Sequence, residues 1–197
     1  KIHRHDQFAV MEMSGHKPGV LEESCDLIRP HMGIVTSVSQ DHYSNFRGIE
    51  NTIKEKTTLV RRVAADGCVF LNADDPAVAG MAASAQAKVM TFGRLDGANY
   101  QAVDVQQNES GWLTFTCKHQ NHAVPFVLPV PAAHLLPSIL GAIACAHQAG
   151  ISLERLARQA AHYQPLLGRC SLHSLGDGRT VICDTAKAPF STLSLAF

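Results

Sequence analysis

Short apolar segments alternate with longer amphipathic segments over the first half of the chain. By their length and hydrophobic period, the apolar segments are predicted strands and the amphipathic segments are predicted helices. The predicted strands are 8–13, 33–38, 68–73 and 88–93, and the predicted helices are 19–28, 49–65 and 74–85. Because strands that alternate with helices build parallel βαβ units, the sequence predicts an α/β fold with a mostly parallel sheet and flanking helices.

The pattern changes after residue 99, where turn residues separate three segments of β type. These predict a small antiparallel meander appended to the parallel sheet, then two helices, two short strands around a Gly-Asp-Gly turn and the start of a last helix. The segments are 100–106, 111–117, 122–128, 134–149, 152–163, the strands flanking 176–178, and 191–197. We place a domain boundary near Gly168–Arg169, which divides the chain into 1–168 and 169–197.

Composition narrows the class of protein. Hydrophobic residues make up 46% of the 197 residues, enough for a sizeable core, and 17 basic residues balance 17 acidic ones. That balance argues against nucleic acid or a membrane surface as a partner, since both usually require a basic excess. The apolar segments are too short to span a membrane. The cysteines form no C-x-x-C pair and several lie inside apolar segments, which indicates buried reduced thiols and a cytoplasmic protein. They are Cys25, Cys68, Cys117, Cys145, Cys170 and Cys183.

Several polar residues follow predicted strands, and the carboxyl ends of parallel strands share one edge of a sheet. These residues are Glu12, Asp41, His42, Asn72, Asp74 and Asp75. Glu12 and His42 would approach each other if their strands are neighbours, and a carboxylate with a neutral imidazole suits Mg²⁺, which keeps several waters and phosphate oxygens. The pattern alone is equally compatible with ordinary polar loop residues.

Other common motifs are missing from the 197 residues. Lys56, taken by itself, is typical of a solvated helix lysine, and the "EKTTL" around it lacks the glycine-rich turn of a phosphate loop. The stretch 117–122 holds one cysteine and two histidines but no second ligand pair at structural-zinc spacing. Zinc and a Cys-His nucleophile therefore have little support from the sequence.

Five segments in register resemble the Mur ligase family, the ATP-dependent amide-forming enzymes of bacterial cell-wall synthesis. "VMEMSGHKPGVLEESCDLIRP" is similar to the family's acidic strand end and helix, and Asp41 and Lys56 keep the family's spacing of fifteen residues. The other three matches are "VFLNADDP", the "LLGR" that resembles a link between domains, and "VICDTAKAPFSTLSLAF". Opening as "KIHRHDQ" and ending as "STLSLAF", the chain is expected to be a piece of a longer protein.

The resemblance implies a mechanism and a set of site residues. ATP would phosphorylate a substrate carboxylate, an amine would attack the acyl phosphate, and Mg²⁺ and cationic side chains would offset the crowding of negative charge. The substrate would be a small molecule or a nucleotide-sugar peptide. By position, Glu12 and His42 would hold magnesium, Lys56 would be the family's carbamylated lysine, Arg169 would face the phosphates, and His134, Asp184 and Lys187 would lie at the nucleotide.

Three departures from the family leave a second interpretation open. The phosphate loop is not among the 197 residues, the adenine-binding run reads "AAHLLPS", and the loop after Asp184 reads "AKAP". Leu135 cannot make the hydrogen bonds of the amide that it replaces. We therefore expect this chain alone to be inactive, and the alternative is a diverged, non-catalytic binding or assembly module. Exposed edges of the parallel sheet would allow pairing with another chain, so a homo-oligomer is possible.

Overall fold

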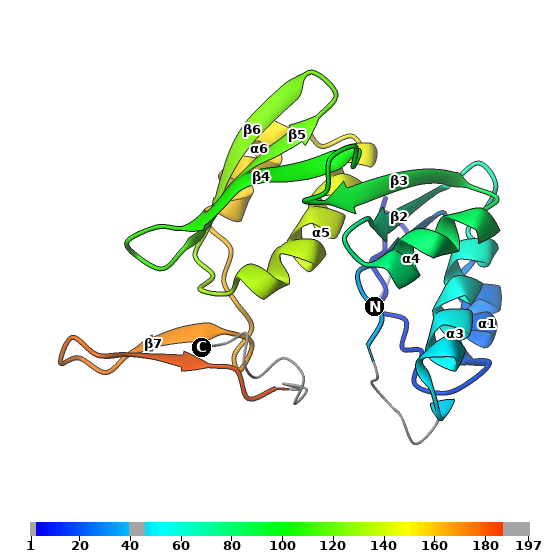
Figure 1. Cartoon of the computed structure of the whole chain (residues 1–197), viewed down its shortest axis with the longest axis horizontal. Helices are drawn as coiled ribbons and strands as arrows, with labels where there is room; N and C mark the ends of the chain where they lie inside the picture. Colours follow the sequence, from blue (N-terminus) through cyan, green and yellow to red (C-terminus); the bar gives the residue numbers. More distant parts are fainter. Residues whose placement is uncertain (1–2, 40–45, 187–197) are drawn as a thin grey trace.

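The computed structural model describes residues 3–39 and 46–186. Within these residues the strands are β1 (Met32–Val35), β2 (Cys68–Asn72), β3 (Lys88–Gly93), β4 (Tyr100–Gln107), β5 (Leu113–His119), β6 (His122–Leu128), β7 (Ser171–Ser174) and β8 (Thr180–Cys183). The first six form one sheet in the order β1-β2-β3-β4-β5-β6, and β7 and β8 form a separate hairpin beside it (Figure 1).

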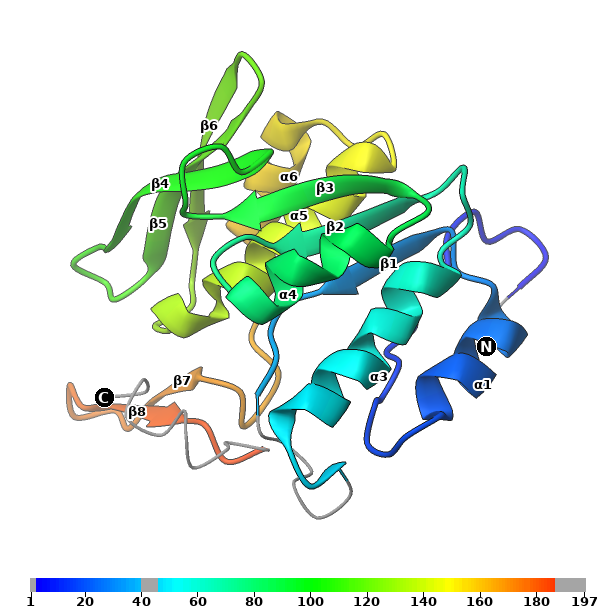
Figure 2. The same cartoon turned by 45° about the vertical axis from the view of Figure 1, so that its right-hand side comes forward.

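The helices cover both faces of the parallel strands. They are α1 (Val20–Ile28), α3 (Ile49–Arg62), α4 (Pro76–Gly80), α5 (Leu136–Gln148) and α6 (Leu153–Ala160), with 3₁₀ turns η1 (Met81–Ser84) and η2 (Ala133–Leu135). Figure 2 shows α1, α3 and α4 on one face of β1–β3, and α5 on the other. The predicted α/β class is therefore confirmed.

The central strand β2 is buried along its whole length, as expected of a parallel strand covered on both sides. Its successive side chains point to opposite faces and enter two separate cores. Phe70 packs in a core with Phe92 and the α5 residue Leu140. Leu71 packs in a second core with Val60 of α3 and Val78 of α4. The two cores hold the helices in position above and below the sheet.

The sheet changes from parallel to antiparallel at β4. Strands β1, β2, β3 and β4 pair in parallel, although β3 and β4 share only two residue pairs. Strands β4, β5 and β6 pair with one another in the antiparallel direction and form the predicted meander. Helix α6 packs against β6, and Ser152 caps it by accepting a hydrogen bond from the Arg155 N–H. The hairpin of β7 and β8 lies within residues 169–197, the predicted start of a second domain.

A buried glutamate joins α1 to α3. Helix α1 has no capping side chain of its own, because its N-cap residue is Gly19, with φ of 86°. Glu55 of α3 supplies the acceptors instead: its carboxylate oxygens lie 2.9 Å from the Gly19 nitrogen and 2.8 Å from the Leu21 nitrogen. Glu55 is only 7% exposed. The first N–H groups of α1 are thus satisfied by a residue more than thirty positions away.

The prediction of a strand at residues 8–13 is wrong, because these residues form no strand in the described structure. These residues lie outside the sheet, and Val10 is 97% exposed. A short apolar run forms a strand only where a neighbouring strand takes up its N–H and C=O groups, and in the described structure β1 pairs only with β2 and is an edge strand. That free edge is where the predicted pairing with a second chain would occur, which stays a prediction. No helix among residues 3–39 and 46–186 is long and apolar enough to cross a membrane.

Candidate functional site

Glu12 lies on the extended segment that leads into α1. It is exposed, and it does not end a strand as the sequence pattern predicted. Three residues later, Gly15 packs beside α3, where a Cβ atom on Gly15 would lie 3.5 Å from Cγ of Glu55. The segment after Glu12 therefore runs along the helix that carries Lys56. The predicted partners Asp41 and His42 lie outside the described residues, so the proposed pair of magnesium ligands stays a prediction.

Lys56 reaches the carboxyl end of β1. Its Nζ donates a hydrogen bond to the carbonyl oxygen of Ser37 at 2.8 Å, and the side chain makes a further interaction. Ser37 follows β1 by two residues, which puts the ammonium group at the edge of the sheet where parallel folds place their ligands. Lys56 thus lies on the side of the sheet where a ligand is expected, and both its role at a site and its carbamylation stay predictions.

The polar residues after β2 hold loops together. Asn72 donates from Nδ2 to the Thr36 carbonyl at 2.8 Å, and Asp74 accepts hydrogen bonds from the Arg94 and Leu95 N–H groups. Asp75 caps α4 and also accepts a hydrogen bond from the Val38 N–H at 2.8 Å. These side chains tie the carboxyl ends of β1, β2 and β3 to one another, which is a structural role.

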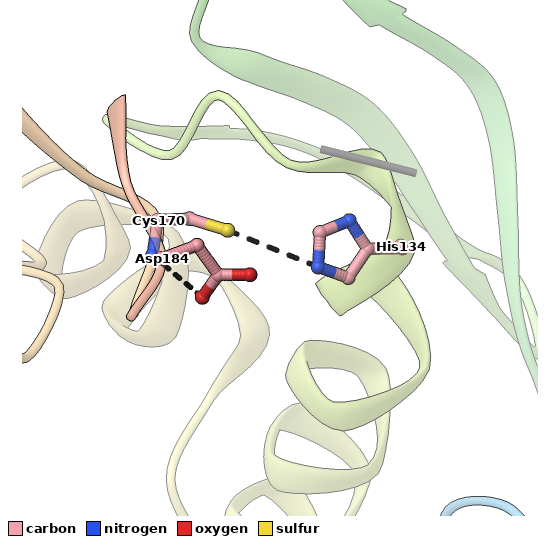
Figure 3. A group of neighbouring side chains, drawn as sticks. All are labelled: His134, Cys170 and Asp184. Atoms are coloured by element: carbon pink, nitrogen blue, oxygen red, sulfur yellow. Dashed lines mark hydrogen bonds between the residues drawn. The ribbon is translucent and has the colours of Figure 1, made fainter. Parts of the chain in front are cut away.

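Three side chains from distant parts of the sequence meet at the junction between the main sheet and the hairpin (Figure 3). His134 comes from η2, Cys170 precedes β7, and Asp184 follows β8. One ligand atom from each, a ring nitrogen, the thiol sulfur and a carboxylate oxygen, lies within 4.8 Å of the other two. Two of the residues predicted to lie at the nucleotide, His134 and Asp184, are thus brought together.

The contacts within this group are specific. The Cys170 sulfur lies 3.8 Å from Nε2 of His134, and the Cys170 N–H donates to Oδ1 of Asp184 at 3.3 Å. The other carboxylate oxygen points toward His134 (Figure 3). Nδ1 of His134 is buried and has no hydrogen-bond partner among the described residues. A buried nitrogen without a partner is uncommon in native proteins, so this ring is a candidate for contact with a ligand.

Burial controls the chemistry of the thiol. Cys170 is 2% exposed, and burial together with the negative charge of Asp184 raises the pKa of its thiol, against the opposing charge of Arg169. The thiol is therefore protonated at neutral pH and unsuited to act as a nucleophile. Cys170 was expected only as one of several buried thiols. Its position directly after the predicted phosphate-facing Arg169 is the one sequence signal that points to it.

Arg169 is exposed beside this group. Its backbone N–H donates to the Leu166 carbonyl at 2.9 Å. The arginine therefore lies next to Cys170 on the outside of the junction, where a phosphate group could reach it. Lys187, the other predicted cation, lies outside the described residues.

Comparison with known proteins gives the family. The Mur ligase middle domain profile matches residues 2–146. UDP-N-acetylmuramoyl-tripeptide--D-alanyl-D-alanine ligase of Mycobacterium tuberculosis is 30% identical over 186 residues, 94% of this chain and 36% of the relative. UDP-N-acetylmuramate--L-alanine ligase of Clostridium acetobutylicum is 28% identical over 187 residues, 90% of this chain and 40% of that protein. The chain thus spans about two fifths of the length of these relatives.

Solved structures agree on the fold. A crystal structure of MurF from Acinetobacter baumannii superposes with a TM-score of 0.89 at 20% identity, covering 98% of this chain and 42% of the other. MurF ligase from Thermotoga maritima in complex with ADP gives a TM-score of 0.82 at 16% identity, over 93% and 42% of the two chains. With the sequence match extending over most of the six-stranded sheet and its helices, the chain belongs to the Mur ligase family.

Proposed function

We propose that this chain is the nucleotide-binding part of an ATP-dependent ligase that joins a carboxylate to an amine in the synthesis of a cell-wall precursor. The observation that carries the proposal is the meeting of His134 and Asp184 at the junction between the sheet and the hairpin. The two residues are fifty positions apart in the sequence, and the family resemblance assigns both to the same nucleotide. A donor substrate of the nucleotide-sugar peptide type is part of the proposal.

The reaction proposed needs an activated carboxylate, since a carboxylate is a poor electrophile with a poor leaving group. Bound ATP with Mg²⁺ supplies the phosphoryl group that makes an acyl phosphate, which the amine then attacks with loss of phosphate. The chain's own contribution is to position these groups and to place positive charge where negative charge accumulates. Arg169 would provide such a charge, whereas Lys56, once carbamylated, would be an anion able to support a second magnesium ion.

Each described site residue has a donor or acceptor suited to its role. Asp184 is a carboxylate whose Oδ1 accepts the Cys170 N–H, and carboxylate oxygens can accept hydrogen bonds from the ribose hydroxyls. His134 brings an unpartnered ring nitrogen, suited to the base or its edge. Glu12 is an exposed carboxylate, the hard oxygen ligand that Mg²⁺ prefers. The donor types therefore fit a magnesium nucleotide.

One feature favours the alternative, a non-catalytic binding or assembly module. Helix α5 begins at Leu136 with Leu135 as its N-cap residue, and no side chain caps it. The amide that the family places there would serve both as a cap and as a contact for adenine. Without it, the affinity for adenine is lowered or lost.

Calorimetry decides between the two functions. We would titrate magnesium-ATP into the protein extended to its natural ends, with Glu12→Gln and Asp184→Asn variants and with Asp66→Asn as the control. Asp66 is exposed in the turn before β2, at the opposite end of the strands from the site. If the proposed ligase function is correct, ATP binding requires magnesium. It also weakens at least about tenfold in Asp184→Asn, equal to about 1.4 kcal/mol. If the folded protein does not bind ATP, the ligase function is refuted and the non-catalytic binding or assembly module is supported.

The 197-residue chain by itself is a second test of the proposal. Its sequence contains no G-x-x-x-x-G-K-[ST] loop, so no cradle of backbone N–H groups is available for the triphosphate. We expect no ATP-dependent release of phosphate from this chain. Measurable phosphate release above that of a Glu12→Gln control would show that the reaction does not need a phosphate loop, which would contradict this prediction.

A further inference from the structure

His134, Cys170 and Asp184 have the donor set of a transition-metal site: one imidazole nitrogen, one sulfur and one carboxylate oxygen, all mutually within 4.8 Å. Zinc sites with three protein ligands and one open position use this kind of mixed set. Hard ions such as Mg²⁺ prefer oxygen alone, whereas sulfur and imidazole favour Zn²⁺ and Co²⁺. The chemistry of the group therefore differs from that of the magnesium pair expected near Glu12.

The distance between the sulfur and the ring nitrogen is close to that of tetrahedral geometry. Bonds of about 2.3 Å to sulfur and about 2.05 Å to nitrogen, at the tetrahedral angle, put the two ligand atoms about 3.6 Å apart. In the structure the Cys170 sulfur and the His134 Nε2 are 3.8 Å apart. An ion bound to both atoms would therefore need only a modest opening of that angle, and the Asp184 carboxylate lies within 4.8 Å of both to complete the set.

We propose that His134, Cys170 and Asp184 bind a single divalent transition-metal ion, Zn²⁺ in particular, with the fourth position left for water or a ligand. On binding, the Cys170 thiol releases its proton to solvent and the thiolate forms the bond to the ion. One thiolate and one carboxylate then balance the two charges of the ion, while the imidazole stays neutral. A buried site with balanced charge avoids the cost of an unpaired ion.

The backbone around Cys170 holds these ligands in place before an ion arrives. The Cys170 N–H fixes one oxygen of Asp184, the kind of outer contact that orients a metal ligand. The Ala186 N–H donates to the Gly168 carbonyl at 2.8 Å, and Ser171 pairs with Cys183 across the hairpin. Cys170 itself has φ of 50°, a left-handed conformation that a residue with a side chain adopts only when its surroundings impose it.

No spacing rule would find this site in the sequence. Its members are 36 and 14 residues apart, so they match none of the short ligand pairs of structural zinc sites. The residues that do lie close in sequence have other partners: His119 donates a hydrogen bond from Nδ1 to the Asn99 carbonyl and stacks on Tyr100. The site follows only from the way the hairpin returns the chain to η2.

Cobalt titration of the 197-residue chain tests the proposal directly. Co²⁺ replaces Zn²⁺ in such sites, and a thiolate ligand gives a sulfur-to-cobalt charge-transfer band in the near ultraviolet. We expect one Co²⁺ per chain with this band, and its loss on addition of one equivalent of Zn²⁺. Cys170→Ser should abolish the band, and His134→Ala should weaken binding by more than about 100-fold, since even outer contacts of a metal ligand contribute roughly 10- to 100-fold.

The control is Cys183→Ser, because Cys183 is another free thiol on the same hairpin. This variant should keep the band and the affinity. A band that survives in Cys170→Ser, or a wild-type chain that shows no band, would overturn the site. Loss of the band in Cys183→Ser as well as in Cys170→Ser would also overturn it, because the hairpin fold would then be responsible. Circular dichroism of each variant confirms that the chain is folded.

Metal and nucleotide would compete, because both use His134 and Asp184; this consequence rests on the proposed function. With the extended protein, one equivalent of Zn²⁺ should lower the apparent affinity for magnesium-ATP in the wild type but leave it unchanged in Cys170→Ser. If ATP does not bind at all, the proposed function fails while the cobalt titration still decides the metal site. If ATP binds equally with and without Zn²⁺, the two ligands occupy different residues and the shared use of His134 and Asp184 is refuted.

Discussion

The contact between Glu55 and the start of α1 gives the sharpest test of the fold. Glu55→Gln keeps the size of the side chain but replaces one acceptor oxygen with an NH₂ group. That group faces either the Gly19 or the Leu21 N–H, both of which now donate to the carboxylate. One hydrogen bond is lost, a buried N–H is left without a partner, and the remaining bond is no longer to a charged acceptor.

The expected cost follows from these contacts. A hydrogen bond to a charged group contributes roughly 1.5–3 kcal/mol, and the carboxylate at the helix N-terminus adds about 0.3–1 kcal/mol through the helix dipole. Since the α1 terminus can partly relax toward water, we expect Glu55→Gln to lower the free energy of unfolding by about 2–3 kcal/mol. Proteins of this kind have about 5–15 kcal/mol in total, so the effect is easily measured.

Urea unfolding followed by circular dichroism measures this change in the free energy of unfolding, with Glu50→Gln as the control. Glu50 lies in the first turn of the same helix and is exposed, so its replacement should change the free energy of unfolding by less than about 1 kcal/mol. If the two variants are equally stable within that margin, the carboxylate of Glu55 does not hold α1, and the reasoning about the shared cap is refuted.

Three further predictions concern stability. Gly67→Ala should be strongly destabilising, because its Cβ would lie 2.1 Å from the backbone oxygen of His31, whereas Gly80→Ala, with open space around it, should not be; thermal unfolding compares the two. Asp75→Ala should cost about 1–3 kcal/mol in urea unfolding, since it removes both the α4 cap and the acceptor of the Val38 N–H; a loss below about 0.5 kcal/mol would contradict this role. Burial raises the pKa of Tyr100 from 10.0 to about 12, so the folded state disfavours its ionised form; stability should fall by roughly 2–3 kcal/mol as pH rises from about 10 to 12, and Tyr100→Phe should remove that part of the alkaline loss.

Periodicity predicted most of the secondary structure correctly because the elements are determined by local pattern and by burial. The buried β2, the amphipathic α3 and the meander were all expected. The exception is residues 8–13, whose short apolar run is typical of a strand but which have no neighbouring strand in the described structure. Pairing with a neighbour is a tertiary property, and a local pattern carries no information about it.

The site was predictable only in part. His134 and Asp184 were identified through the family resemblance, and the structure brings them together. Cys170 was missed, because it lies 36 residues from His134 and 14 from Asp184, a spacing that matches no short ligand pair. Glu55 was also missed, although it lies four positions before the apolar-side residue Leu59 and so on the buried face of α3. A charged residue on the apolar face of a predicted helix is the signal that would have found it.

The group at the junction has its ligands on two bodies: His134 belongs to the main sheet unit, whereas Cys170 and Asp184 belong to the hairpin. The connection between them includes the exposed Leu166 and Leu167, whereas Cys170 packs into the core of the main sheet and holds the hairpin there. A ligand held by all three residues binds only while the hairpin is docked on the main sheet unit, so its affinity depends on the fraction of docked molecules. If only a tenth of molecules are docked, the apparent dissociation constant rises about tenfold above its intrinsic value. Conversely, a bound ligand lowers the free energy of the docked arrangement, so the junction acts as a sensor of its own closure.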